Sequence, residues 1–284
     1  MSTNPIEIIG LVKRYGTTTA VNELDLTVRQ GTVHGFLGPN GSGKSTTIRA
    51  LLGLIRPDAG QLNVLGHNPT THPAEATQRV AYVPGDVALW PHLTGAQALA
   101  TLAKLRHPKH GDNPARRAEL IERFEFDPTK KIRAYSKGNR QKIILIAALA
   151  ANVDVLVLDE PTSGLDPLME REFGTCVRER VNEGASVLLS SHILSEVQEL
   201  ADDITIIRDG TLVETGTLAN LTHLRGFRIS AELPDGNRFE HLYSSDEVPA
   251  QLQYLLDHQA TQITCTPAGL EDIFLDHYTT KAAS

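Results

Sequence analysis

Cysteine is scarce in this sequence. Only two of its 284 residues are cysteines, Cys176 and Cys265, and they form no CxxC pair. This excludes the disulfide framework of a small secreted domain and favours a reduced cytosolic setting. The first residues, MSTNPIEIIG, include neither a basic region nor a long apolar run, so we expect no secretory signal.

Long apolar runs are also missing. The stretch IILIAALAANVDVLVL at 143–158 is the one that could mislead, and Asn152 and Asp154 interrupt it. A membrane-spanning helix needs about 20 predominantly apolar residues. We therefore interpret the stretch as a buried helix followed by a buried strand, and we expect no membrane span.

The chain has no excess of basic residues. Lysine and arginine number 27 against 34 aspartates and glutamates, which gives a net charge of −7. Bulk electrostatic binding to nucleic acid or to an anionic membrane requires positive charge. We expect no nucleic-acid partner. Hydrophobic residues make up 40%, enough for a packed core in one large or two modest domains.

Apolar strand-like runs alternate with helical patterns along most of the chain. Runs such as VDVLVLDE and ASVLLSSH are typical of strands buried on both faces, so they predict an α/β fold with a mostly parallel sheet. The runs before Gly31 alternate more regularly and predict an N-terminal antiparallel β flap. Two helical patterns within residues 87–151 predict a helical subdomain inserted into the sheet domain.

The pattern changes after Gly216. FRISAEL and RFEHLY flank a Pro-Asp-Gly turn and predict a hairpin, and VPAQLQYLLDH and LEDIFLDHY predict short helices. We therefore predict a large domain at 1–219 and a small appended α+β domain at 220–284. In its last helix four apolar side chains share one face, which indicates packing: Leu270, Ile273, Phe274 and Tyr278.

The segment GPNGSGKST at 38–46, here called the phosphate loop, follows the strand-like VHGFL and precedes the helical TIRALLGL. It matches the pattern GxxxxGK[ST], in which glycines let backbone N–H groups surround phosphate oxygens. In that pattern Lys44 reaches the β- and γ-phosphates and the Ser45 hydroxyl binds Mg²⁺. A chance glycine-rich turn is the alternative. We predict a nucleotide and Mg²⁺ site at Gly38, Pro39, Asn40, Gly41, Ser42, Gly43, Lys44, Ser45 and Thr46.

Two adjacent carboxylates end the apolar run VLVLDEP at 155–161. Successive side chains of a strand point to opposite sides, so Asp159 and Glu160 cannot share one role. We expect Asp159 to join the Mg²⁺ shell and Glu160 to accept a proton from water. An acidic strand end without function is the alternative. The sequence contains no N-K-x-D motif of the kind that reads guanine.

With the phosphate loop, the segments YSKGNRQK (135–142), VLVLDEPTSGLDP (155–167) and LLSSHILSEV (188–197) resemble the ATP-binding subunit of an ABC transporter. The resemblance covers about residues 5–220 and implies a P-loop NTPase core that hydrolyses ATP and drives a separate membrane permease. The chain would then lie at the cytoplasmic face of the cell membrane. It also implies a dimer, most simply of two copies of this chain, with ATP between the phosphate loop of one copy and the signature segment (135–139) of the other.

The resemblance implies further roles by position. Tyr15 matches the aromatic residue that stacks on adenine, although a strand core residue is the alternative. His192 matches the histidine that touches the γ-phosphate. The crossing loop, residues 163–166, matches the loop at the dimer interface. Its Asp166 precedes Pro167, which is also a good pair for starting a helix.

Two positions depart from the family pattern. Gly85 stands where the family has a glutamine. Either the next residue, Asp86, is a metal ligand in its place, or water fills the gap, or Gly85 is a hinge. In the signature segment, Ser136 and Gly138 are kept, but Lys137 replaces a glycine and Asn139 replaces a glutamine. This variant and the LEDIFL segment are similar to the ABC-2 branch, which implies export of a drug, lipid or polysaccharide.

Three cations crowd the start of the helix that begins after Ser136: Lys137, Arg140 and Lys142. A helix N-terminus already carries partial positive charge. Either these side chains point into solvent, or an anion reaches them from a second chain. Trp90 is either a permease contact within 85–105 or a core residue. The HPKH loop at 107–110 offers two histidines but no third ligand, so we expect a solvated loop rather than a metal site. Two rival functions remain. One is a soluble ATPase that acts on ribosomes or DNA without a permease, and the other is a module that senses ATP but hardly hydrolyses it.

Overall fold

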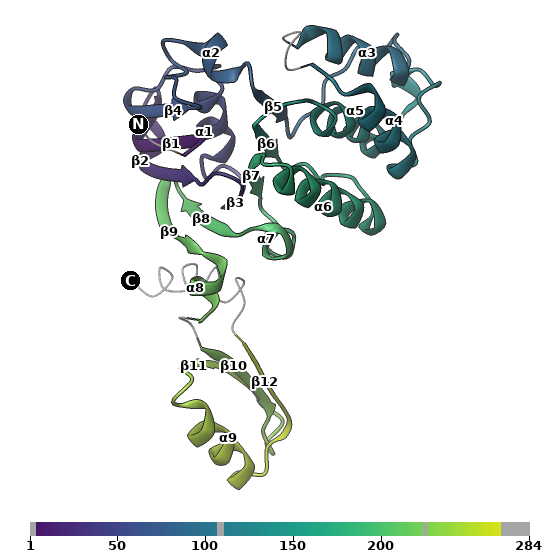
Figure 1. Cartoon of the computed structure of the whole chain (residues 1–284). Helices are drawn as coiled ribbons and strands as arrows, with labels where there is room; N and C mark the ends of the chain where they lie inside the picture. Colours follow the sequence, from purple (N-terminus) through teal and green to yellow (C-terminus); the bar gives the residue numbers. More distant parts are fainter. Residues whose placement is uncertain (1–3, 107–110, 224–225, 268–284) are drawn as a thin grey trace. The chain divides into compact units, whose positions relative to one another are not determined.

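The computed structural model describes residues 4–106, 111–223 and 226–267 (Figure 1). The predicted HPKH loop and the predicted helix LEDIFLDHY lie outside these residues. The described chain divides into two compact units, one ending at Thr215 and the other beginning at Gly216, whereas the sequence placed the boundary after residue 219. Among the described helices, none is both long enough and apolar enough to cross a membrane.

A six-stranded sheet forms the centre of the first unit. Five neighbouring strands pair in parallel in the order β5, β6, β7, β3 and β8, and β9 follows at the edge. Every residue of β3, β6 and β7 is buried, as the near-continuous apolar runs predicted. The strand bounds are β3 Val33–Leu37, β5 Val80–Val83, β6 Val155–Asp159, β7 Ser186–Ser191, β8 Asp203–Arg208 and β9 Thr211–Thr217.

The predicted antiparallel flap is confirmed. Its strands β1 (Ile6–Tyr15), β2 (Thr18–Val28) and β4 (Ala59–Val64) pair in the order β2-β1-β4, and both pairings are antiparallel. Ile8 and Leu62 of the flap belong to the same hydrophobic core as Phe36 and Val157 of the parallel sheet. The flap therefore shares a core with the sheet and with helix α1 (Lys44–Leu51).

The helices between β5 and β6 form the inserted subdomain. These are α3 (Gly95–Leu105), α4 (Pro114–Arg123), the short 3₁₀ helix η2 (Ile132–Ala134) and α5 (Lys137–Leu149). They lie together beyond the β5 edge of the sheet (Figure 1), with α3 and α4 both in contact with α5. A capping box of Thr94 and Gln97 fixes the start of α3, since each side chain bonds the other residue's backbone N–H.

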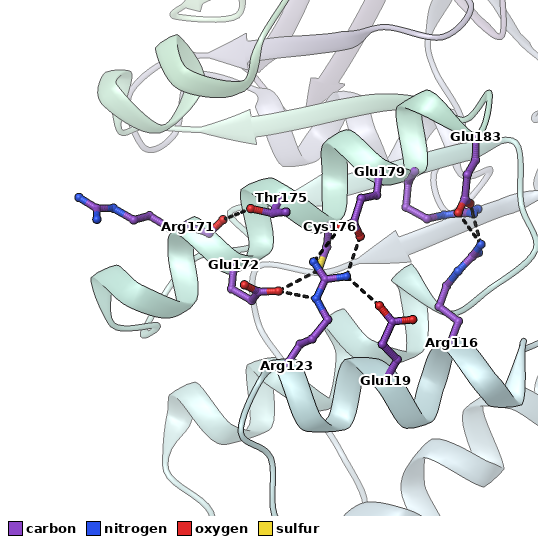
Figure 2. A network of polar contacts seen from close by, with 10 residues as sticks. Arg116, Glu119, Arg123, Arg171, Glu172, Thr175, Cys176, Glu179 and Glu183 are labelled. Carbon is purple, nitrogen blue, oxygen red and sulfur yellow. Dashed lines mark hydrogen bonds and ion pairs between the residues drawn. The ribbon is translucent and has the colours of Figure 1, made fainter.

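An ion-pair network joins this subdomain to α6 (Pro167–Asn182), the helix that follows β6 (Figure 2). The Arg123 guanidinium of α4 contacts Glu119 on its own helix and both Glu172 and Glu179 on α6. Its hydrogen bond to Glu179 is the main reason that the pKa of Arg123 is raised. Burial raises the pKa of the neighbouring Cys176 thiol to about 12, so this cysteine is an inert packing residue.

The second unit is a small α+β domain. Its sheet has the order β11-β10-β12, and the predicted hairpin is β10 (Phe227–Glu232) with β11 (Arg238–Tyr243). Helix α9 (Val248–Asp257) contributes Leu255 to a core with Ile229. Two further elements, α8 (Leu218–His223) and β12 (Thr261–Pro267), were not predicted, nor were α2 (Pro73–Thr77) and α7 (Leu194–Leu200) in the first unit.

His34 is a titratable side chain buried inside the parallel sheet. It lies on β3 with 2% of its surface exposed, and its Nε2 shares a 2.8 Å hydrogen bond with Thr205 Oγ1 on β8. Burial lowers the pKa of His34 from 6.5 to about 4. Between these two pKa values, His34 is mostly protonated in the unfolded chain and mostly neutral in the folded protein.

This difference predicts a loss of stability with acid. As pH falls from the unfolded pKa of 6.5 toward the folded pKa of about 4, the unfolded state binds more protons and becomes favoured. We expect wild type to lose about 2 kcal/mol more unfolding free energy between pH 7 and pH 5 than His34→Gln, which does not titrate. Urea titrations at both pH values measure this, and equal losses in the two proteins would contradict it.

Candidate active site

The phosphate loop connects the end of β3 to the start of α1, as predicted. Gly43 precedes α1 with φ of 108°, a left-handed conformation that favours glycine. A Cβ on Gly38 would lie 2.3 Å from the carbonyl oxygen of Ile207, and one on Gly43 would lie 2.5 Å from that of Ala20. Packing therefore requires glycine at both positions, and at Gly43 the left-handed backbone requires it as well.

Lys44 is held inside this loop. Its Nζ donates hydrogen bonds to the carbonyl oxygens of Gly38 (2.7 Å) and Pro39 (3.1 Å) and lies 4.0 Å from Glu160 Oε1. Burial lowers the pKa of Lys44, while Glu160 and Asp159 oppose that shift. The hydroxyl of Ser42 is buried without a hydrogen-bond partner in the described part of the chain. An unpaired buried donor beside a charged amine suits an oxyanion ligand.

The two carboxylates at the end of β6 point to different partners. Asp159 is 4% exposed and accepts a hydrogen bond from Ser190 Oγ on β7. Glu160 has φ of 46°, so the chain turns sharply as it leaves the sheet. Glu160 Oε1 lies 3.1 Å from Nδ1 of His192, which follows β7. Parallel pairing of β6 with β7 thus brings together residues that are far apart along the chain.

A cavity of about 260 Å³ opens between these groups. The oxygen-bearing side chains of Ser45, Asp159 and Asp86, all named as metal ligands from the sequence, line it together. Hydroxyl and carboxylate oxygens are the ligands that Mg²⁺ prefers. One hydroxyl and two carboxylates would leave positions in its coordination shell for water and phosphate oxygens. The described residues contain no cluster of three or more His, Cys, Asp or Glu side chains fit to hold a metal alone. The full lining is Ser45, Arg49, Tyr82, Pro84, Gly85, Asp86, Lys137, Asp159, Glu160 and Ser163.

Gly85, which stands where the family has a glutamine, lines this cavity. A Cβ on Gly85 would meet Asp159 O at 3.5 Å, an ordinary contact, and Gly85 is not in the left-handed region. Nearby, Tyr82 faces Asp159, and burial is the main cause that raises the pKa of Tyr82 to about 12. Neither Tyr82 nor Arg49 was singled out in the sequence, because no motif marks them.

The signature segment packs against the crossing loop of the same chain. Ser136 caps α5 by accepting a hydrogen bond from Asn139 N at 3.3 Å. Lys137 Nζ donates to Ser163 Oγ at 2.8 Å, and a Cβ on Gly138 would lie only 2.2 Å from Gly164 O. Glycine at 138 is thus required for this close approach.

The three cations at the start of α5 are used differently. Lys137 lines the cavity with Glu160 and bonds the crossing loop, whereas Lys142 Nζ donates to the carbonyl oxygen of Phe124 at the end of α4. Lys142 therefore belongs to neither alternative raised from the sequence, since it stabilises a helix C-terminus. Arg140 is partly exposed.

Three other predicted residues can now be located. Tyr15 is 49% exposed at the end of β1, with Lys13 Nζ 5.3 Å from its ring centroid, so it is not a strand core residue. Trp90 is 44% exposed, which excludes the core alternative there. Asp166 caps α6 by accepting hydrogen bonds from Leu168 N and Met169 N, so the helix-starting role of the Asp166–Pro167 pair is confirmed.

Comparison with known proteins decides the family. Residues 21–163 match the model of the ABC transporter family. The chain belongs to the ABC transporter family. It is 41% identical to the daunorubicin resistance ATP-binding protein DrrA3 of Streptomyces coeruleorubidus, over 78% of this chain and 71% of that protein. It is 33% identical to the bacitracin transport ATP-binding protein BcrA of Bacillus licheniformis, over 82% and 76% respectively.

Solved ABC structures agree with this assignment. A structure titled as the ATP binding subunit of an ABC transporter aligns with a TM-score of 0.72 and 27% identity, covering 87% of this chain and 99% of that one. The ABC transporter cassette MJ0796, at 20% identity and a TM-score of 0.68, shares the fold. The predicted P-loop NTPase fold and the predicted resemblance are confirmed. The chain is an ABC ATPase that binds and hydrolyses ATP to power a separate permease.

The close contact of Gly138 with Gly164 predicts that alanine is tolerated less well at Gly138 than at Gly85. Gly138→Ala forces a methyl group against Gly164 O, and overpacking of this kind costs about 1–3 kcal/mol. Gly85→Ala meets only an ordinary contact, so we expect a change within about 0.5 kcal/mol. Urea unfolding of both variants measures the difference, and equal stabilities would show that the signature segment and the crossing loop are not in close contact.

Proposed function

We propose that this chain hydrolyses MgATP as a dimer with a second ATPase subunit, most simply a second copy of itself, and thereby drives export of a small molecule through its permease. The observation that carries the proposal is the convergence of Lys44, Glu160 and His192 at the ends of three neighbouring parallel strands. Ligands of α/β proteins bind at this edge of the sheet.

Glu160 is the general base in this proposal. Its Oε1 lies within reach of two nitrogen groups, Lys44 Nζ at 4.0 Å and His192 Nδ1 at 3.1 Å, so its carboxylate is held at the rim of the cavity and oriented. From there it accepts the proton of a water molecule. Lys44 and the backbone N–H groups of the phosphate loop stabilise negative charge on the transferring phosphoryl group.

The residues around the cavity fit Mg²⁺. Ser45 and Asp159 would hold it, with Asp86 as a further oxygen ligand at the position next to Gly85. When bound, Mg²⁺ neutralises charge on the β- and γ-phosphates. Ser190 keeps the Asp159 carboxylate in place by donating a hydrogen bond to it. Tyr15 would stack on the adenine, which its exposed ring permits.

The signature segment would act on the nucleotide of the second subunit. Ser136 and Lys137 are exposed at the N-terminus of α5, where partial positive charge favours an anion. Gly138 lies against Gly164 of the crossing loop. We propose that Gly138, its neighbour Asn139 and Asp166 at the end of that loop take part in the same contact with the second subunit. One chain thus offers two half-sites, and a second chain would complete each.

The permease and its cargo are proposed from relatives. Proteins named for daunorubicin resistance, bacitracin transport and Nod factor export are 41%, 33% and 36% identical to this chain. We propose export of a drug, a lipid, a polysaccharide or a similar substrate. The permease would hold the chain at the cytoplasmic face of the cell membrane, with exposed Trp90 at the contact.

Replacing the base tests the chemistry. Glu160→Gln keeps the size of the side chain but cannot accept the proton, so ATP hydrolysis should fall by about 10²-fold or more. ATP binding should stay within about threefold, because Lys44 and the phosphate loop are unchanged. Steady-state hydrolysis and nucleotide binding measure the two quantities. Equal hydrolysis by wild type and variant would remove Glu160 from the mechanism.

A further inference from the structure

Glu196 lies on the first turn of α7, within the segment LLSSHILSEV but with no role assigned to it so far. Each of its two carboxylate oxygens accepts a hydrogen bond from a hydroxyl. Thr162 Oγ1 donates to Oε1 at 2.6 Å, and Ser191 Oγ donates to Oε2 at 2.8 Å. Both hydroxyl residues are buried, at 7% and 1% exposure.

These two hydroxyls belong to the two segments that carry the chemistry. Thr162 follows the proposed base Glu160 by two residues, and Ser191 directly precedes His192. The first segment comes from the end of β6 and the second from the end of β7. Glu196 therefore joins, through one carboxylate, the segments that present Glu160 and His192 to each other at 3.1 Å.

Sheet pairing alone does not fix that distance. The ladder between β6 and β7 ends at Asp159 and Ser190, with one more bond from Glu160 N to Ser190 O at 3.0 Å. Beyond it the first segment turns at Glu160, whose φ is 46°, and the second turns into α7. The side chains of Glu160 and His192 thus lie past the ladder, where Glu196 is the next cross-link.

We propose that Glu196 is a positioning residue for ATP hydrolysis, which holds the Glu160 and His192 segments in register. The proposal rests on the function proposed above. A carboxylate suits the task because it accepts both bonds, and hydrogen bonds to a charged acceptor are roughly twice as strong as neutral ones. Ser191 Oγ also accepts a bond from Ile193 N at 2.9 Å. As a donor it lies closer to Glu196 Oε2, at 2.8 Å, than to the carbonyl oxygen of Ile193, at 3.3 Å.

The surroundings of Glu196 argue that its charge does not serve stability alone. Glu170 and Glu199 line one cavity together with Glu196. The pKa of Glu170 is raised by burial first and then by the charge of Glu196. A carboxylate among like charges adds repulsion, which offsets part of what its two hydrogen bonds contribute. Removing it should therefore affect catalysis more than folding.

The experiment compares hydrolysis by the full chain with MgATP. Glu196→Ala should lower kcat by about 10- to 100-fold with KM within about twofold, since a misplaced catalytic group costs rate rather than ATP binding. Glu196→Gln, which keeps the shape and can bond one hydroxyl fully, should lie between wild type and Glu196→Ala. Glu199→Ala is the matched control on the same helix, and it should stay within about twofold of wild type.

Two partner variants separate positioning from packing. Thr162→Val removes one donor at nearly constant volume and should lower kcat several-fold, whereas Thr162→Ser keeps the hydroxyl and should restore it. Because both residues act through one contact, Thr162→Val should add little in the Glu196→Ala background, so their effects should be non-additive. A purely structural role would instead change the midpoint of thermal unfolding and leave the kcat of the folded protein unchanged.

The outcomes are distinguishable. If wild type hydrolyses no faster than Glu160→Gln, the proposed function fails and this proposal fails with it. Suppose instead that wild type hydrolyses ATP faster than Glu160→Gln. If Glu196→Ala and Glu196→Gln then both keep kcat within about twofold of wild type, only the positioning role is overturned. Independent, multiplying effects of Thr162→Val and Glu196→Ala would overturn it as well.

Discussion

The parallel pairing of β6 with β7 is the constraint on which the rest of the site depends. It aligns the carboxyl ends of two strands that are separated along the chain by all of α6, and it sets Asp159 opposite Ser190. From those ends emerge the proposed base Glu160, the proposed Mg²⁺ ligand Asp159 and His192. β3, which pairs with β7 on its other side, brings the phosphate loop to the same edge. The chemistry is thus assembled by strand order, while each loop contributes one or two side chains.

A second close contact links this edge to the inserted helices. Gly138 approaches Gly164 without room for a methyl group, and buried Gln141 donates from Nε2 to the carbonyl oxygen of Pro161 at 2.8 Å. The start of α5 is therefore tied to the crossing loop of its own chain. The ion pairs of Arg123 tie α4 to α6 further along. Motion of the inserted helices would therefore reach the crossing loop through the first connection and α6 through the second.

Much of this could be predicted from the sequence, because the relevant signals are local. The phosphate loop and the strand VLVLDE each carry their own glycines, apolar runs and carboxylates in order. What could not be predicted depends on partners far away in the chain. Glu196 on a short helix is an ordinary surface acid until Thr162 and Ser191 are placed beside it. Strand β12 was missed because only Ile263 of its mostly exposed residues packs into the small core.

The central claim is that one chain holds half of each ATP site and a second chain completes it. Sedimentation velocity of Glu160→Gln, which should bind ATP without hydrolysing it, tests this most directly. We expect the 30.9 kDa chain to sediment as a dimer with MgATP and as a monomer with MgADP. A single chain at every concentration of ATP that saturates binding would contradict it.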